Sequence, residues 1–286
     1  MRTTLKTAAL AVAAALALTA CGSDDDAAGG DETAAADGAT TLSIGASITP
    51  HAEILEFVRD ELAADAGLEL EIVEYEDYIL PNENLADGSL DANYFQHQPY
   101  FDSQVAERGY EFGHFPGVHI EPYALYSGRD GDTPRYASTG ELPDGAVIGI
   151  TNDPSNQARA LDLLVQDGLI TLADTGDADP TVLDVADNPK GLEFREADPA
   201  SLARALEDVD AAIINGNYAL EAELSAVEDS LLVESGDDNP YANFVAYRSE
   251  DEGDEALATL DELLRSDEVR AFIEERWPLG EVLPAF

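Results

Sequence analysis

The sequence predicts an α/β protein with two lobes, each built from alternating strands and helices. Residues 42–75 read as a strand, a helix and a strand with short connections, which is the pattern of a βαβ unit with parallel pairing. A second alternation starts at Ala146, after residues 128–145, which are rich in Gly, Pro, Asp and Thr and indicate a loop. We therefore expect one lobe on each side of this loop.

The first unit can be traced in order. Residues 42–46 alternate between apolar and polar side chains, which favours a strand. Thr49 and Pro50 suit the start of a helix, and the apolar residues that follow recur at helical spacing until Gly67. Residues 68–75 alternate again and predict the second strand of the unit.

The rest of the chain continues the alternation of strands and helices. We expect further helices at residues 101–108, 155–166, 202–209, 254–265 and 267–277, and further strands at 119–127, 146–150, 210–214 and 243–248. Pro122 cannot donate to a strand ladder, so it indicates an edge or a crossover within the strand at 119–127.

The N-terminus indicates an exported, lipid-anchored protein. Residues 1–20 have a basic start and an apolar stretch too short for a comfortable membrane span, as in a secretory signal peptide. Residues 18–21, LTAC, resemble a bacterial lipobox, so we expect Cys21 to carry a lipid and the protein to reach the cell membrane through that anchor only. Residues 21–40 are small and acidic, which predicts a flexible tether.

The charge of the chain excludes several classes of partner. Its 60 acidic residues against 14 basic ones give a formal net charge of -46. Phosphate contacts need Lys and Arg, so we expect no nucleic-acid binding and no attraction to an anionic lipid surface. The acidity fits a salt-rich habitat or a lineage whose exported proteins are generally acidic. Cys21 is the only cysteine, so the fold has no internal disulfide.

Residues 75–101 combine tyrosines and phenylalanines with amides and a histidine. Aromatic side chains with polar tips need partners when buried, and turn signals place several of them at element ends. Such a stretch indicates either the wall of a small-molecule pocket or a satellite aromatic core. His97 within it is interpreted first as a wall residue, with a metal ligand and a hydrogen-bonded core histidine as alternatives.

A second candidate stretch is residues 152–159, NDPSNQAR. Asn152 or Asp153 can cap the following helix, whose first N–H groups would then offer an anion site at the carboxyl end of a strand. Arg159 shares a helix face with Asn156 and can take a carboxylate with its planar fork. The alternative is an exposed arginine paired with the surplus carboxylates.

Two asparagines follow or begin predicted strands. Asn215 comes directly after the apolar strand at 210–214, and Asn243 starts the strand at 243–248. An amide can donate and accept at once, so it suits both ends of a zwitterion; the alternative is that both are turn asparagines. The chain contains no Gly-x-Ser-x-Gly, His-Glu-x-x-His, P-loop or dinucleotide motif, so we expect neither an enzyme nor a cofactor.

Several motifs together resemble the NlpA-type lipoproteins, the methionine-binding components of ABC importers. The matching segments cover nearly the whole mature chain in the order of that family: the lipobox, YILPN at 78–82, residues 90–100, residues 152–159, PTVLDV at 180–185 with Asn188-Pro189, residues 214–219, and Pro240-Tyr241 with Asn243. The combination is specific, although the acidic residues near 75–77 depart from an ordinary pocket mouth.

The resemblance implies a two-lobed periplasmic-binding-protein fold with a ligand cleft between the lobes. The lobes would comprise residues 41–127 with 238–286, and residues 128–237. Arg159 would hold the carboxylate of L-methionine or a close relative, and Asn215 and Asn243 would bond its polar groups. The side chain of the ligand would be enclosed by Tyr78, Phe95, His97 and Tyr100.

By the same resemblance, the partners would be an ABC permease and its ATPase subunit. Two other functions stay open from the sequence. One is a metal-ion receptor that uses His97, His114 and His119, although their spacing fits no zinc template. The other is a surface lipoprotein without a small ligand.

Overall fold

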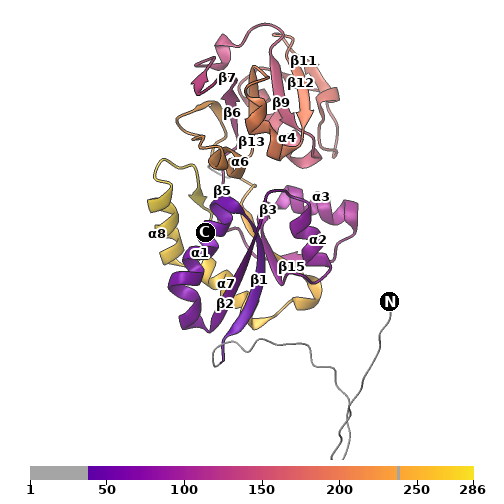
Figure 1. Ribbon diagram of the computed structural model, residues 1–286. Helices are drawn as coiled ribbons and strands as arrows, with labels where there is room; N and C mark the ends of the chain where they lie inside the picture. The colour runs from indigo at the N-terminus through magenta and orange to yellow at the C-terminus, as the bar shows by residue number, and fades with distance from the viewer. Residues whose placement is uncertain (1–37, 237–238) are drawn as a thin grey trace, which may run out of the picture. The chain divides into compact units, whose positions relative to one another are not determined.

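Two β-sheets, each covered by helices on both faces, form the part of the chain that this computed structural model describes, residues 38–236 and 239–286 (Figure 1). These residues fall in one compact unit, Ala35–Phe286. The predicted signal peptide, the lipidation of Cys21 and the tether up to residue 37 lie outside the described residues. Thr40, the last residue assigned to the tether, begins the first strand.

The first sheet has the strand order β16-β5-β15-β3-β1-β2, with β4 paired to β15. Its strands are β1 (Thr40–Ser47), β2 (Leu68–Tyr75), β3 (Ala92–His97), β4 (Phe112–His114), β5 (His119–Ile120), β15 (Asn243–Arg248) and β16 (Leu283–Pro284). β1 runs parallel to β2 along its whole length, which confirms the predicted βαβ unit. β15 pairs antiparallel with β3, so a late strand completes a sheet begun by the N-terminal residues.

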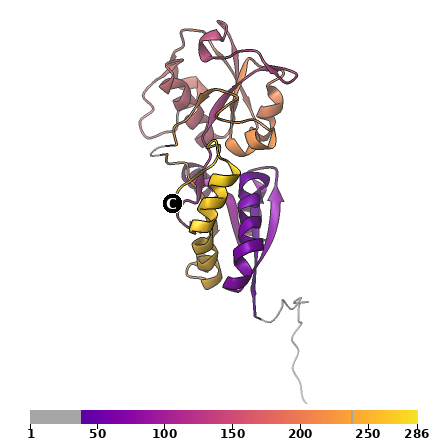
Figure 2. The same cartoon turned by 90° about the vertical axis from the view of Figure 1, so that its left-hand side faces the viewer.

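One face of the first sheet is covered by the helical run after β1 and by the last two helices. The run comprises η1 (Ile48–Ala52), α1 (Glu53–Val58), η2 (Arg59–Ala63) and η3 (Ala64–Ala66), and the final helices are α7 (Glu255–Leu264) and α8 (Asp267–Arg276). The run stops at Gly67, whose φ of 74° ends a helix without strain because glycine has no Cβ. Figure 2 shows α8 beside α1, where Phe57 and Phe272 stack with ring centroids 4.5 Å apart.

The other face of the first sheet carries α2 (Leu80–Ala86) and α3 (Gln98–Arg108). Leu85 and Phe101 from these helices pack against Phe244 and Ala246 of β15 in a small buried cluster. The aromatic stretch therefore supplies both core residues and, at its strand and helix ends, the rings described below. α3 begins three residues earlier than predicted, because the His97 side chain accepts the Tyr100 N–H and caps it.

The second sheet has the order β12-β9-β13-β6-β14. Its strands are β6 (Ala124–Ser127), β9 (Val147–Thr151), β12 (Glu193–Ala197), β13 (Ala211–Ile214) and β14 (Ser230–Val233), and its helices are α4 (Pro154–Gln166), α5 (Leu202–Ala205) and α6 (Gly216–Glu221). Two short hairpin pairs, β7 (Arg129–Asp130) with β8 (Thr133–Pro134) and β10 (Thr171–Leu172) with β11 (Val185–Asp187), decorate it. Separate apolar clusters fill its two faces, so each sheet has its own core.

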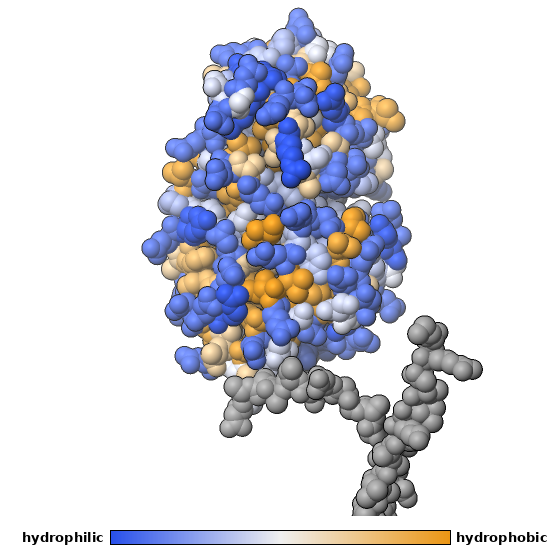
Figure 3. All heavy atoms as spheres, viewed as in Figure 1, coloured by the Kyte–Doolittle hydropathy of each residue, from blue (hydrophilic) through white to orange (hydrophobic). Residues whose placement is uncertain are grey.

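Short 3-10 turns complete the assignment: η4 (Thr139–Glu141), η5 (Val182–Asp184), η6 (Pro199–Ser201) and η7 (Ser249–Asp251). Within the described residues, no helix combines the length and the apolar character that a membrane crossing requires. Figure 3 shows hydrophilic residues over most of the visible face, with apolar ones in scattered patches.

The chain crosses between the sheets twice. Residues 121–123 connect β5 of the first sheet to β6 of the second. The second crossover lies between β14 and β15, and its described residues are 234–236 and 239–242. The single strand predicted at 119–127 is therefore two strands in different sheets. β6, which the sequence analysis placed in the first lobe, pairs with β13 and β14. Pro122 explains the break, because it cannot donate to a ladder, and it lies in the first crossover.

Candidate ligand site

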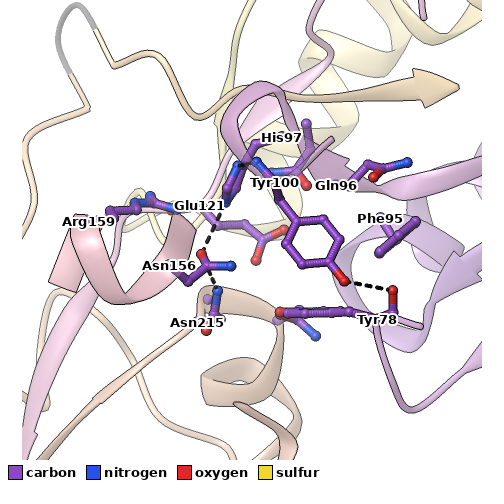
Figure 4. Close-up of a pocket in the computed structure, with 12 residues that line it drawn as sticks. Tyr78, Phe95, Gln96, His97, Tyr100, Glu121, Asn156, Arg159 and Asn215 are labelled. Atoms are coloured by element: carbon purple, nitrogen blue, oxygen red, sulfur yellow. Dashed lines mark hydrogen bonds between the residues drawn. The ribbon is translucent and has the colours of Figure 1, made fainter. Parts of the chain in front are cut away.

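A pocket where the two sheets meet is lined by all seven side chains that the sequence analysis selected. These are Tyr78, Phe95, His97, Tyr100, Arg159, Asn215 and Asn243. Five further residues complete the lining, namely Gln96, Glu121, Asn156, Gly216 and Asn217. Figure 4 shows that side chains from segments far apart in the sequence point toward one another here.

The fold brings these residues together because they lie at the ends of elements. His97 closes β3, Asn243 opens β15 beside it, and their backbones are paired in the first sheet. Asn215 follows β13, and Arg159 lies in the second turn of α4, both in the second lobe. Glu121 lies in the first crossover, between the two. The pocket is thus at the switch between two α/β sheets, where such folds bind ligands.

Aromatic rings form one side of the pocket. The ring centroid of Tyr78 lies 5.9 Å from that of Phe95, 5.7 Å from that of Tyr100 and 5.1 Å from that of Tyr218, and the ring pairs are tilted or edge-on. The Tyr100 hydroxyl donates to the backbone oxygen of Tyr78 at 2.9 Å, and the Tyr78 hydroxyl donates to Oδ1 of Asn217 at 2.5 Å. The polar tips of the rings are therefore satisfied and their faces and edges are left for apolar contact.

A chain of hydrogen bonds fixes the orientation of three polar side chains across the two lobes (Figure 4). Nδ1 of His97 accepts the Tyr100 N–H, so the ring proton is on Nε2 and is donated to Oδ1 of Asn156 at 3.1 Å. The same Oδ1 accepts Nδ2 of Asn215 at 3.0 Å. Burial, and secondarily the charge of Arg159, lowers the pKa of His97 to about 3, so the imidazole is neutral.

This chain leaves specific atoms without partners. Because Asn215 donates through Nδ2, its Oδ1 is a buried acceptor with no hydrogen bond among the described residues. Asn217 accepts the Tyr78 hydroxyl through Oδ1, and its Nδ2 is likewise a buried donor without a partner in the described part of the chain. Buried polar atoms are usually paired, so an orphaned acceptor and an orphaned donor in one pocket indicate a polar ligand.

Arg159 is buried, with 5% of its surface exposed, and its guanidinium is held on several sides. Nε donates to Glu234 at 3.1 Å and Nη2 donates to the second Glu234 oxygen at 2.5 Å and to the backbone oxygen of Glu121 at 3.0 Å. The guanidinium carbon, Cζ, lies 4.0 Å from the ring centre of Tyr241 and 4.8 Å from that of Tyr123. Of the three guanidinium nitrogens, Nη1 alone has no hydrogen-bond partner among residues 38–236 and 239–286. The exposed, surface-paired alternative for Arg159 is wrong.

Glu121 is a buried carboxylate that lines the pocket. Its Oε1 accepts Nε2 of His119 at 2.9 Å and lies 3.3 Å from Nε2 of His51. Nδ1 of His119 hydrogen-bonds the Tyr94 hydroxyl, and Nε2 of His51 also reaches Oδ1 of Asn243 at 3.1 Å. Burial raises the pKa of Glu121, and a backbone hydrogen bond from Asn217 opposes that rise.

The histidines proposed for a metal receptor do not gather. His97 bonds Asn156, His114 stacks on Phe244 and bonds the oxygen of Phe115, and His119 belongs to the Glu121 network. In the described residues, the group able to hold a metal is instead His51, His119 and Glu121, with ligand atoms within 4.8 Å of one another. Their contacts at 2.9 and 3.3 Å are those of a hydrogen-bonded network.

The predicted anion site at the start of α4 is also wrong. The Asp153 carboxylate caps this helix, and its Oδ1 accepts both the backbone N–H and Nδ2 of Asn156 at 3.0 Å. A second anion would face this carboxylate. The cap has a different use, because it orients Asn156 and through it the amide of Asn215.

Sequence reasoning missed Glu121 and Asn217 as pocket residues. Asn217 stood inside the motif at 214–219, and Glu121 precedes the proline of the first crossover, which was a usable signal. Gly216 is required by close approach, because a Cβ there would lie 2.5 Å from Cβ of Glu121. The free space between the lining side chains is only about 20 Å³, enough for about one water.

Fold and pocket together define a two-lobed solute-binding protein, with its site at the junction of two α/β lobes. Comparison with known proteins agrees. The family model described as NlpA lipoprotein matches residues 42–286. The chain belongs to the NlpA lipoprotein family, a family of substrate-binding lipoproteins and not of enzymes.

Individual relatives match over most of their length. The methionine-binding lipoprotein MetQ of Bacillus subtilis (strain 168) is 38% identical over 271 residues, 93% of each chain. The D-methionine-binding lipoprotein MetQ of Escherichia coli (strain K12) is 34% identical and covers 91% of this chain and 90% of its own. A nutrient-binding protein from Burkholderia cenocepacia, solved bound to methionine, is 40% identical with a TM-score of 0.80, over 86% of this chain and all of its own.

Proposed function

We propose that this protein captures L-methionine, or a close relative, between its two lobes and delivers it to the permease of an ABC importer. The observation that carries the proposal is the complementary set of orphaned polar atoms beside an aromatic wall in a closed interlobe pocket. The similar proteins named or solved as methionine-binding support the same ligand.

The polar atoms suit the two charged ends of an amino acid. Nη1 of Arg159 and Nδ2 of Asn217 are donors for a carboxylate. Oδ1 of Asn215 and the Glu121 carboxylate are acceptors for an ammonium group. Asn243 keeps a second lone pair on the oxygen that His51 bonds, so it can contribute a further acceptor.

The aromatic wall suits the ligand side chain. Tyr78, Phe95 and Tyr100 present ring faces and edges, and the hydroxyls of the two tyrosines are already bonded within the protein. A thioether packs favourably at ring edges, with a contribution of about 0.3–1.5 kcal/mol per contact. His97 adds a neutral ring, so no charge opposes the apolar side chain.

Binding requires movement. The remaining space of about 20 Å³ cannot admit an amino acid unless the lobes separate or the rings turn. We propose that residues 121–123 and the described residues of the second crossover, 234–236 and 239–242, act as the hinge. Ligand then links the lobes by bonding residues of both, and the closed geometry signals occupancy to the permease.

The proposed cellular setting follows from the family. Its members are lipoproteins, so we propose an extracytoplasmic protein anchored at the cell membrane by a lipid on Cys21, acting with a permease and an ATPase subunit. Lobe boundaries are proposed at the two crossovers, and both methionine enantiomers are candidates because some relatives are named for D-methionine.

Mass spectrometry of small molecules released by denaturing the freshly purified protein tests the ligand assignment. We expect methionine or a close relative in a ratio approaching one per protein chain. A chiral separation of the released material then assigns the enantiomer. Release of a metal ion or of an unrelated solute at that ratio would contradict the proposal, and a protein that releases nothing is tested by direct titration.

A further inference from the structure

Arg159 is in contact with both crossovers, and Glu234 supplies the strongest of these contacts. From the first crossover come the backbone oxygen of Glu121 and the ring of Tyr123. From the second come the Glu234 carboxylate and the ring of Tyr241. A side chain that begins in α4 of the second lobe is therefore fixed by the two segments about which the lobes would move.

The Glu234 carboxylate bonds two of the three guanidinium nitrogens of Arg159. Its two oxygens accept Nε at 3.1 Å and Nη2 at 2.5 Å, in a pair whose side chains are 12% and 5% exposed. Oε2 of Glu234 also accepts the backbone N–H of Tyr123 at 3.2 Å, and the N–H of Glu234 donates to the oxygen of Tyr123 at 2.8 Å. One carboxylate therefore ties the arginine, the first crossover and the second crossover together.

The pair limits what the arginine can offer a ligand. With Nε and Nη2 bonded to protein acceptors, a ligand carboxylate can reach Nη1 alone, so it cannot take the fork in the two-bond manner. Arg159 also lines a second, outer hollow of about 300 Å³, which is bordered by Asp162, Glu234 and Tyr241 among others and shares no aromatic-wall residue with the pocket. Without its partner the guanidinium could turn into this hollow.

We propose that Glu234 is a positioning residue that locks Arg159 with Nη1 aimed into the pocket and so sets the selectivity for a free carboxylate. The proposal rests on the proposed function, since it assumes that Arg159 meets the ligand carboxylate. For the loss of the Glu234 charge, the proposal predicts weaker methionine binding, whereas electrostatics alone predicts stronger binding. Removing a negative charge beside the site would by itself strengthen the binding of an anionic group, whereas losing the lock weakens it.

The test compares Glu234→Gln and Glu234→Asp with Asp162→Asn in the full folded protein. Asp162 faces the same outer hollow, and in the described residues no hydrogen bond or ion pair joins it to Arg159. Asp162→Asn therefore removes a nearby charge without unlocking the arginine. Each variant is titrated by calorimetry with L-methionine and with L-methioninamide, which lacks the carboxylate, and its melting temperature is measured without ligand.

We expect Glu234→Gln to weaken methionine binding about tenfold or more and to leave methioninamide nearly unchanged, in line with the loss of a charge-assisted bond. Glu234→Asp keeps the charge but shortens the reach, so it should weaken methionine binding to an intermediate degree. Asp162→Asn removes a charge but keeps the lock, so it should bind methionine at least as tightly as the unmodified protein does.

Three results would overturn the proposal. Unchanged or stronger methionine binding in Glu234→Gln would show that the carboxylate only neutralises the arginine. Equal weakening of both ligands would indicate a general structural role. Full affinity in Glu234→Asp would exclude a lock that depends on reach. Titration of the unmodified protein with L-methionine tests the proposed function separately. If that protein binds no methionine, the proposed function fails and not only the role of Glu234.

Discussion

Nε2 of His97 lies 3.1 Å from Oδ1 of Asn156, and this contact joins the end of β3 in the first lobe to α4 in the second. The ring must donate there, because Nδ1 already accepts the Tyr100 N–H. The same Asn156 oxygen orients Asn215, so one neutral histidine aligns an amide in the ligand site and links the lobes.

Arg159→Ala should weaken L-methionine binding by about tenfold to a hundredfold, because a charge-assisted bond to the ligand carboxylate contributes about 1.5–3 kcal/mol. Calorimetry checks this, with methioninamide as the control ligand that should lose far less. The substitution also removes the partner of Glu234, so the melting temperature without ligand should fall as well. Equal methionine affinity in the variant would remove the carboxylate role from Arg159.

Glu121→Gln should weaken methionine binding about tenfold or more, because the carboxylate is the negatively charged group proposed to face the ligand ammonium. The matched control is 4-(methylthio)butanoate, which has the carboxylate and the thioether but no amino group. Its affinity, however low, should not fall in the variant. A parallel loss for both compounds would mean that Glu121 supports the fold of the pocket and does not recognise the ammonium.

His97→Phe keeps an aromatic ring in the wall and removes the donor to Asn156. We expect methionine affinity to fall about fivefold to tenfold, since a neutral hydrogen bond that orients Asn215 contributes about 0.5–1.5 kcal/mol. Small-angle scattering with saturating ligand should still show closure. Unaltered affinity would show that the interlobe bond is not needed to align the amide.

The same variant tests the proton linkage of His97. Its pKa is lowered to about 3 in the folded protein, so between pH 6.5 and 3 the unfolded chain binds a proton that the folded chain does not. The free energy of unfolding therefore falls as the pH drops through this window, by about 2 kcal/mol from pH 7 to 5 for one such histidine. His51, lowered to about 4, and His119, lowered to about 3, act in the same direction, while Glu121, with a raised pKa, opposes them.

Urea unfolding at pH 7 and pH 5 measures this linkage. Because the other groups are common to both proteins, the loss of stability between the two pH values should be smaller in His97→Phe by about 1–2 kcal/mol. Identical losses in the two proteins would place the pKa of His97 near its ordinary value in the folded state.

The surplus of negative charge predicts that added salt stabilises the fold. With a formal net charge of -46, the folded chain repels itself, and raising NaCl from 0.1 to 1 M shortens the screening length from about 10 to about 3 Å. The melting temperature followed by circular dichroism should rise by several degrees. Choline chloride should act almost as well, since screening does not depend on the cation. A melting temperature that is flat or falls with salt would contradict dominant self-repulsion.

Local signals made much of the fold predictable from sequence. Gly67 and Gly109 end their helices with φ of 74° and 70°, and alternation located residues 68–75 and 243–248 with the observed bounds. Apolar periodicity does not say which sheet a strand joins, so β6 was placed in the wrong lobe. Pairing depends on contacts between residues far apart in the sequence, which alternation alone does not encode.

The residues of the candidate site were largely predictable from the sequence, but the hydrogen bonds between them were less so. The resemblance and the strand ends selected seven residues that line one pocket. The sequence offered Asn152 or Asp153 as the cap of α4, and Asp153 is the one that caps it, but it was not predictable that Glu234 would bond both Nε and Nη2 of Arg159. That pairing depends on geometry set by the folded chain, and in a sequence with 60 acidic residues no signal marks which carboxylate lies beside a given arginine.

Calorimetric titration of L-methionine into protein that has been unfolded, dialysed and refolded tests the central claim most directly, because this treatment removes any copurified ligand. We expect one site per chain with a dissociation constant below about 1 μM, which corresponds to about 8 kcal/mol of binding free energy. Absence of heat and of any melting-temperature shift with methionine at millimolar concentration would contradict the account.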